Sequence, residues 1–169
     1  MTLIRKQKIT LTLLLLTTMC FLTSCYFKSP WTAEERQKFE NECLSETTVD
    51  NLSLKLKGFD DVDFDSILVK EFKDDIIIDS FKVSIRKSGT PDDKKNKIRY
   101  ASINRTFNLT HLYKFIISGQ EPYELTNMKM AVTNEFTMQG EGHGCRLNEY
   151  AINGKQSEQE QTITFEKKQ

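Results

Sequence analysis

The 169-residue chain lacks the motifs on which most catalytic and metal sites depend. It has only two histidines, His111 and His143, and it contains neither a His-Glu-x-x-His zinc motif nor a Cys-x-x-Cys pair. A Gly-x-Ser-x-Gly nucleophile motif, a phosphate-binding loop and a dinucleotide fingerprint are also absent. We therefore expect a protein that is not an enzyme and that has no cofactor.

The chain also lacks an excess of charge of one sign. It carries 24 Lys and Arg residues against 24 Asp and Glu residues, and the basic residues are interspersed with acids instead of forming a stripe. Nucleic-acid binding depends on clustered Lys and Arg. The composition therefore favours partners other than nucleic acid.

A long hydrophobic run is missing as well. The apolar stretch Ile9–Leu22 supplies 14 uncharged residues, whereas a membrane-spanning helix needs about 18–20. Arg5, Lys6 and Lys8 precede it. A basic start followed by a short apolar stretch is typical of a secretory signal that is removed.

Residues 22–25 read Leu-Thr-Ser-Cys and resemble the bacterial lipobox, in which a small residue precedes an obligatory Cys. The resemblance implies cleavage between Ser24 and Cys25, a diacylglyceryl thioether on Cys25 and acylation of the new amine. Two or more acyl chains hold a protein stably on a membrane. We expect a signal peptide over 1–24, a lipidated tether over 25–31 and a folded domain over 32–169.

The residues after Cys25 indicate where the anchored protein lies. Known sorting rules use an Asp after the lipidated Cys for inner-membrane retention, and Tyr26 occupies that position here. No acidic run follows that would favour surface export. We expect an outer-membrane lipoprotein on the periplasmic face. Cleavage removes three basic residues, so 21 basic and 24 acidic residues remain and the formal charge becomes −3.

The cysteines divide by position. Cys20 leaves with the signal and Cys25 carries lipid, so Cys43 and Cys145 remain as a pair in an oxidising compartment. We expect a disulfide that closes a loop of about 100 residues. The alternatives are two unpaired thiols or a reactive Cys145.

Hydrophobic periodicity predicts a mainly β protein. Thr32 and Glu35 form a capping box before a helix that ends near Leu44, and after Asp50 the period changes to two. Strand patterns follow at 52–56, 67–72, 81–85, 100–107, 112–118, 123–132, 147–152 and 162–165, with a turn or loop at 88–97, a glycine-rich loop at 140–144 and a polar turn at 156–161. This pattern predicts a single antiparallel β-sandwich, Ig-like or transthyretin-like, with one short N-terminal α-helix.

Two segments carry a family resemblance. Leu112–Ser118, the turn at 120–122 and Tyr123–Met130 resemble a hairpin of transthyretin-like or carboxypeptidase-regulatory-like sandwiches. Gly144–Lys155 is similar to the end of small bacterial envelope lipoproteins with that core. Such domains are mostly non-catalytic, so the resemblance implies no site residues.

Glu141, His143 and Cys145 form the one segment where catalytic residue types gather. Their side chains suit either a metal or a Cys–His nucleophile pair, so a metal-dependent or Cys/His hydrolytic accessory is an alternative function. Zinc needs three or four ligands. We therefore favour a glycine-rich loop beside a structural disulfide.

Asp61, Asp63 and Asp65 suggest a cation site. An EF-hand loop starting at Asp61 fails, because it requires Gly and Glu where the chain has Ser66 and Phe72. In an extended segment the three carboxylates share one face, which is the ordinary pattern of a solvated edge. A calcium-stabilised adhesion-type domain is the alternative.

These observations together favour a lipid-anchored, non-enzymatic protein of the cell envelope. Its partners are expected to be the membrane lipid, through acylated Cys25, and a protein or glycan that the β-sandwich binds or scaffolds.

Overall fold

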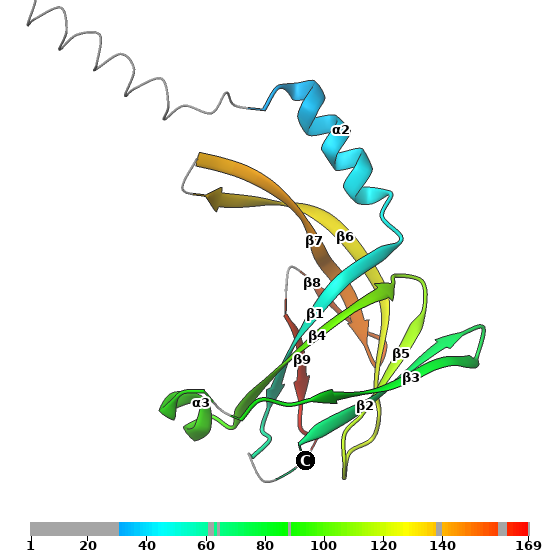
Figure 1. Ribbon diagram of the computed structural model, residues 1–169, viewed down its shortest axis with the longest axis vertical. Helices are drawn as coiled ribbons and strands as arrows, with labels where there is room; N and C mark the ends of the chain where they lie inside the picture. Colours follow the sequence, from blue (N-terminus) through cyan, green and yellow to red (C-terminus); the bar gives the residue numbers. More distant parts are fainter. Residues whose placement is uncertain are drawn as a thin grey trace, which may run out of the picture. The chain divides into compact units, whose positions relative to one another are not determined.

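The computed structural model describes residues 31–60, 63, 65–87, 89–137, 140–158 and 162–168. It confirms a mainly β fold of two sheets with one N-terminal helix of 12 residues (Figure 1). The chain forms two compact units. Of the described residues, one unit holds those within 31–38 and 133–144, and the other holds those within 39–132 and 145–168.

The N-terminal helix α2 (Ala33–Leu44) begins at the predicted capping box. The Thr32 amide donates to Glu35 Oε2 at 2.8 Å, and the Glu35 amide donates to Thr32 Oγ1 at 3.2 Å. The hydrogen bond from the Thr32 backbone, followed by that from its side chain, lowers the pKa of the Glu35 carboxyl. The last turn of the helix buries Cys43.

The smaller sheet has three strands in the order β4 (Ile98–Asn108), β1 (Thr48–Lys57) and β9 (Ile163–Glu166). Leu52, Leu54 and Leu56 of β1 are buried and alternate with less buried residues, as the period of two predicts. β1 pairs antiparallel with β4 but parallel with β9. This one parallel pairing departs from an all-antiparallel sandwich.

The larger sheet has six strands whose order differs from their order in the chain. In sheet order they are β3 (Ile76–Ser84), β2 (Ser66–Lys73), β5 (Leu112–Ile116), β6 (Tyr123–Thr137), β7 (Gly140–Ile152) and β8 (Lys155–Glu158). Two-residue turns at Asp74–Asp75 and Asn153–Gly154 connect β2 to β3 and β7 to β8. All four turn residues have positive φ, as type I′ hairpins require.

Side chains from both sheets meet in one hydrophobic core. The ring of Phe165 on β9 lies 5.0 Å from the ring of Phe115 on β5 and 4.8 Å from that of Tyr123 on β6. The Tyr123 hydroxyl also donates to the Glu166 carbonyl at 2.6 Å. These contacts join the two layers of the sandwich.

Some segments differ from their predicted structure. Residues 140–144, predicted as a loop, belong to β7, and residues 156–158, predicted as a turn, belong to β8. Residues 159–161 lie outside the described part. A short helix, α3 (Pro91–Lys95), occupies part of the predicted turn at 88–97, because Thr90 Oγ1 accepts the Asp93 amide at 3.0 Å.

Candidate functional site

The structure joins Cys43 and Cys145 in a disulfide, with Cα atoms 5.5 Å apart and a sequence separation of 102. The bond links the last turn of α2 to β7. A bonded sulfur has no thiol to ionise, so the interpretation of Cys145 as a nucleophile is wrong for this structure. Cys25 lies outside the described residues.

The described neighbours of His143 include no metal-binding group. Residues 140–144 form a strand instead of a loop, and the side chain of Glu141 lies outside the described part. The His143 ring packs edge-on against Trp31 with ring centres 4.9 Å apart. Among the described residues, no group of three His, Cys, Asp or Glu side chains could hold a metal ion.

The two described aspartates, Asp63 and Asp65, do not lie in the extended edge that the alternating pattern predicted. Asp63 lies in a turn, where its amide donates to the Asp60 carbonyl at 3.1 Å. Its carboxylate accepts the Asp60 amide at 2.7 Å and the Lys167 ammonium at 3.1 Å. Burial raises the pKa of this carboxyl, but the hydrogen bonds and nearby lysines outweigh burial and lower it.

A lysine as the partner of Asp63 disfavours the calcium interpretation, because the ammonium already neutralises the carboxylate. Asp65 is exposed, and its backbone carbonyl accepts the Ile85 amide at 2.9 Å. Asp61 lies outside the described residues. Neither Asp63 nor Asp65 belongs to a group of three ligands that could hold a cation among the described residues.

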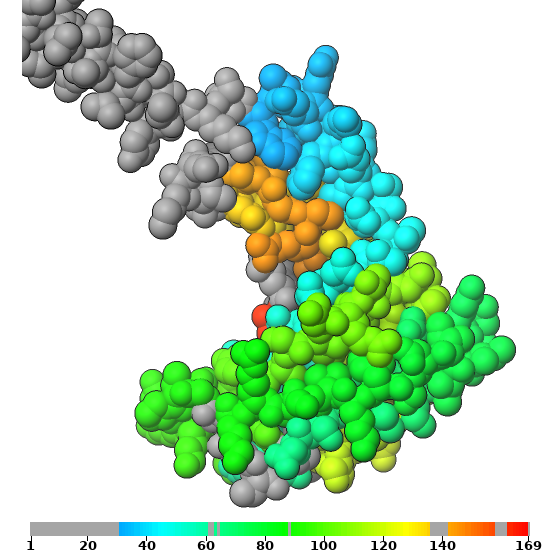
Figure 2. All heavy atoms as spheres, in the orientation of Figure 1, coloured from blue at the N-terminus to red at the C-terminus, as the bar shows by residue number. Residues whose placement is uncertain are grey.

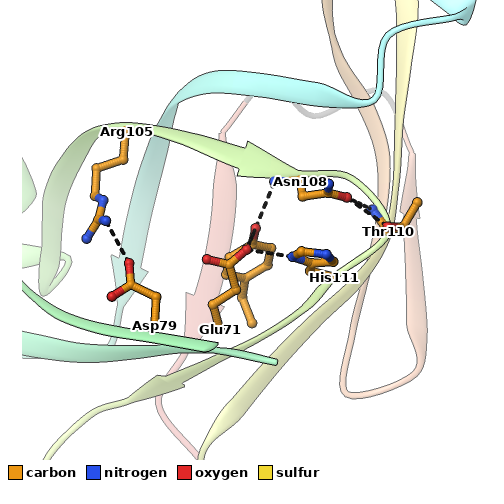
Figure 3. A network of polar contacts seen from close by, with 7 residues as sticks. Glu71, Asp79, Arg105, Asn108, Thr110 and His111 are labelled. Atoms are coloured by element: carbon orange, nitrogen blue, oxygen red, sulfur yellow. Dashed lines mark hydrogen bonds and ion pairs between the residues drawn. The ribbon is translucent and has the colours of Figure 1, made fainter. Parts of the chain in front are cut away.

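Instead, the structure reveals a polar network that the sequence did not suggest. The Tyr113 hydroxyl donates to Glu71 Oε1 at 2.8 Å, and Nδ1 of His111 lies 2.6 Å from the same oxygen. The Asn108 amide donates to the Tyr113 hydroxyl at 2.8 Å (Figure 3). Burial, followed by the hydrogen bond to Glu71, raises the pKa of Tyr113.

This network lies where the chain passes from one sheet to the other. Asn108 ends β4, and His111 precedes β5, where Tyr113 pairs with Glu71 of β2. A His that is hydrogen-bonded to a Glu carboxylate can also act as a general base. In the described part of the chain, however, no hydroxyl or thiol is hydrogen-bonded to the His111 ring. We therefore interpret the network as a clamp on the β4–β5 connection.

Two surface hollows flank His111. One, of about 460 Å³, is lined by Leu109–Leu112, Thr126–Lys129 and Gln156. The other, of about 340 Å³, is lined by residues 72–75 and 110–112, and therefore lies beside the turn of the β2–β3 hairpin. Both linings mix polar and apolar side chains.

The β2–β3 hairpin carries the largest exposed apolar cluster among the described residues. Ile76, Ile77 and Ile78 are 67%, 51% and 50% exposed, and they lie on β3, one of the two edge strands of the larger sheet. Figure 2 shows the hairpin, in teal and green, at the right-hand border of the view. Adjacent exposed isoleucines on an edge strand mark an interaction surface or an aggregation hazard.

The clamp interpretation predicts that the network stabilises the folded domain. Tyr113→Phe should lower the free energy of unfolding by about 1–3 kcal/mol, because the Asn108 amide loses its acceptor while the ring volume is kept. Urea denaturation at pH 7 measures this loss. An unchanged free energy would contradict the clamp interpretation.

The same substitution should alter the pH dependence of stability. The pKa of Tyr113 is raised in the folded state, so its contribution is fully present below its unfolded pKa of about 10 and is lost as the pH rises towards the folded value. Urea denaturation at alkaline pH should therefore show a smaller decline in stability for Tyr113→Phe than for the wild type.

Comparison of the chain with protein-family models, curated proteins and solved structures finds no match. The resemblances to lipobox lipoproteins and to transthyretin-like sandwiches therefore stay predictions. Among the described residues, no helix is long and apolar enough to span a membrane.

Proposed function

We propose that this chain is a lipid-anchored, non-enzymatic protein of the bacterial cell envelope that binds or scaffolds a protein partner. Its place is the periplasmic face of the outer membrane, where acylated Cys25 holds it. The lipobox-like residues 22–25 and the preceding secretory signal support the anchor. The β-sandwich supplies the rigid body.

The observation that carries the binding role is the exposed Ile76–Ile78 cluster on β3. Burying one such side chain fully contributes about 1.5–3 kcal/mol, so an apolar partner surface gains free energy by covering it. The isoleucine side chains offer no hydrogen-bonding group. They therefore favour a protein partner over a glycan.

Several side chains of the types that serve catalysis have structural contacts in the described part of the chain. Cys145 is in a disulfide, His143 packs on Trp31, and Glu71 and Tyr113 hydrogen-bond within the network that holds His111. These contacts leave Cys145 without a free thiol and tie Glu71 and Tyr113 to the β4–β5 connection.

Two single substitutions of N-terminal cysteines test whether Cys25 is the lipid anchor. Cys25→Ser should block lipidation, so the precursor accumulates and the mature lipidated form is lost. Cys20→Ser is the matched control, because it also replaces a cysteine of the segment but leaves the acceptor in place. Membrane fractionation and electrophoretic mobility measure both. Normal processing of Cys25→Ser would contradict the proposal.

A further inference from the structure

The charges along the β2–β3 hairpin make its outer edge self-complementary. Asp74 and Asp75 precede the three isoleucines, and Lys82 follows them. All three charged side chains are exposed and form no ion pair with another described residue. If two such edges lie antiparallel, the carboxylates of each meet the lysine of the other. A parallel alignment instead places carboxylate beside carboxylate.

Asp79 is the one acidic residue between these ends, and its charge is already compensated. Its Oδ2 accepts a hydrogen bond from the Arg105 guanidinium at 2.6 Å (Figure 3). Its Oδ1 accepts a hydrogen bond from the Ser80 amide at 2.7 Å. The centre of the edge therefore presents apolar side chains without an uncompensated charge. Two copies can approach there without strong repulsion.

We propose that the occupant of this edge is a second copy of the chain, bound antiparallel about a two-fold axis beside Ile78. Pairing Asp75 with Lys82 then places Ile76 opposite Phe81, which is half-buried beneath the Arg105 guanidinium. Isologous two-fold contacts are the commonest in homo-oligomers. The inference rests on the proposed function, because it names the partner of the same hairpin.

Side chains carry this contact more than backbone pairing does. The β2–β3 register shifts between Glu71 and Phe72, which leaves an extra residue on β3, and the Ser80 amide is capped by Asp79. A bulge and a capped amide both limit strand addition. The isoleucines and the two Asp–Lys pairs therefore supply the attraction.

The size of the patch implies a weak dimer that depends on tethering. Stable soluble interfaces bury about 800 Å² on each partner, more than a few side chains at a hairpin provide. Confinement raises the effective concentration of a tethered partner to about the millimolar range. We therefore expect dimers in the membrane and monomers in dilute solution.

Cysteine crosslinking of the full-length chain in membranes tests the proposal. Ile78→Cys should form a disulfide-linked species of twice the monomer mass on mild oxidation. Ser102→Cys is the matched control, because Ser102 is exposed on β4 of the other sheet. Peptide mapping confirms that Cys43 and Cys145 remain joined in both variants, and equal melting temperatures confirm that both fold.

Exchanging the charges of Asp75 and Lys82 tests the antiparallel register specifically. In the Ile78→Cys background, Lys82→Asp should reduce crosslinking about tenfold, because symmetry makes the substitution act at two pairs. Adding Asp75→Lys should restore the crosslink. Loss without restoration would overturn the antiparallel register.

The remaining outcomes separate this inference from the proposed function. Crosslinking of Ile78→Cys to a protein of different mass would overturn self-association and leave the hairpin as the contact surface. Crosslinking no stronger than that of Ser102→Cys would overturn both. A chain that crosslinks through Ile78→Cys outside the membrane would support self-association and contradict the anchor.

Discussion

Phe165→Ala is expected to lower the free energy of unfolding by about 3–5 kcal/mol, the largest effect of any substitution considered for this domain. Phe165 is fully buried, and its ring lies against Phe115 and Tyr123 of the opposite sheet. Removing the ring leaves a cavity between the sheets, and three aromatic side chains lose their mutual contacts. Urea denaturation followed by far-ultraviolet circular dichroism measures the loss.

Ile77→Ala is the matched control for this substitution. It also removes apolar atoms from a strand, but Ile77 is 51% exposed, so less area is lost from the folded state and the cost should stay below about 1 kcal/mol. The same variant shows that hairpin substitutions leave the domain folded. Equal losses for the two variants would contradict the assignment of Phe165 to the core.

Removing the disulfide by a joint Cys43→Ser and Cys145→Ser substitution should cost about 2–5 kcal/mol. The bond spans 102 residues, so it restricts the unfolded chain over most of the domain, and the chain-entropy model gives up to about 4.7 kcal/mol for a loop of this size. The loss should appear as a lower urea midpoint for unfolding.

Chemical reduction supplies the control for this prediction. In dithiothreitol the wild type should unfold at the same urea concentration as the double variant does without reductant. The urea midpoint of the double variant should not change when dithiothreitol is added. Peptide mapping without reductant should link Cys43 to Cys145. Free thiols at both positions in the folded protein would contradict the disulfide.

The elements that local chemistry determines could be predicted from the sequence. Thr32 and Glu35 are three residues apart, so their capping box forms within one turn and sets the start of α2. Leu52, Leu54 and Leu56 alternate because one face of β1 is buried. The apolar alternation of residues 123–132 slips by one between Leu125 and Met128, and Asn127 within β6 has a positive φ there.

The sequence also held signals that the strand prediction missed. Asn153–Gly154 is the strongest two-residue hairpin signal, and it precedes β8. Thr90 and Pro91 are a typical helix start, and they open α3. By contrast, Ile76–Ile78 shows no period of two, and Asp74–Asp75 lacks the glycine that usually marks a type I′ turn. The start of β3 was therefore not recognisable.

The polar network could not be predicted, because its members are distant in the chain. Glu71 is separated from His111 by 40 residues and from Tyr113 by 42. Only the antiparallel pairing of β2 with β5 brings Glu71 beside Tyr113. The Asn108 amide then reaches the same hydroxyl through the β4–β5 turn. The pairing register between strands that are distant in the chain determines such a site, and the local hydrophobic pattern does not reveal that register.

The central claim, that acylated Cys25 anchors this β-sandwich, is tested most directly by the mass of the N-terminal peptide of the native protein. The account predicts a peptide that begins at Cys25 and carries a diacylglyceryl group and an N-acyl chain, recovered from the membrane fraction. A peptide that begins at Met1 and contains an unmodified Cys25, recovered from the soluble fraction, would contradict it.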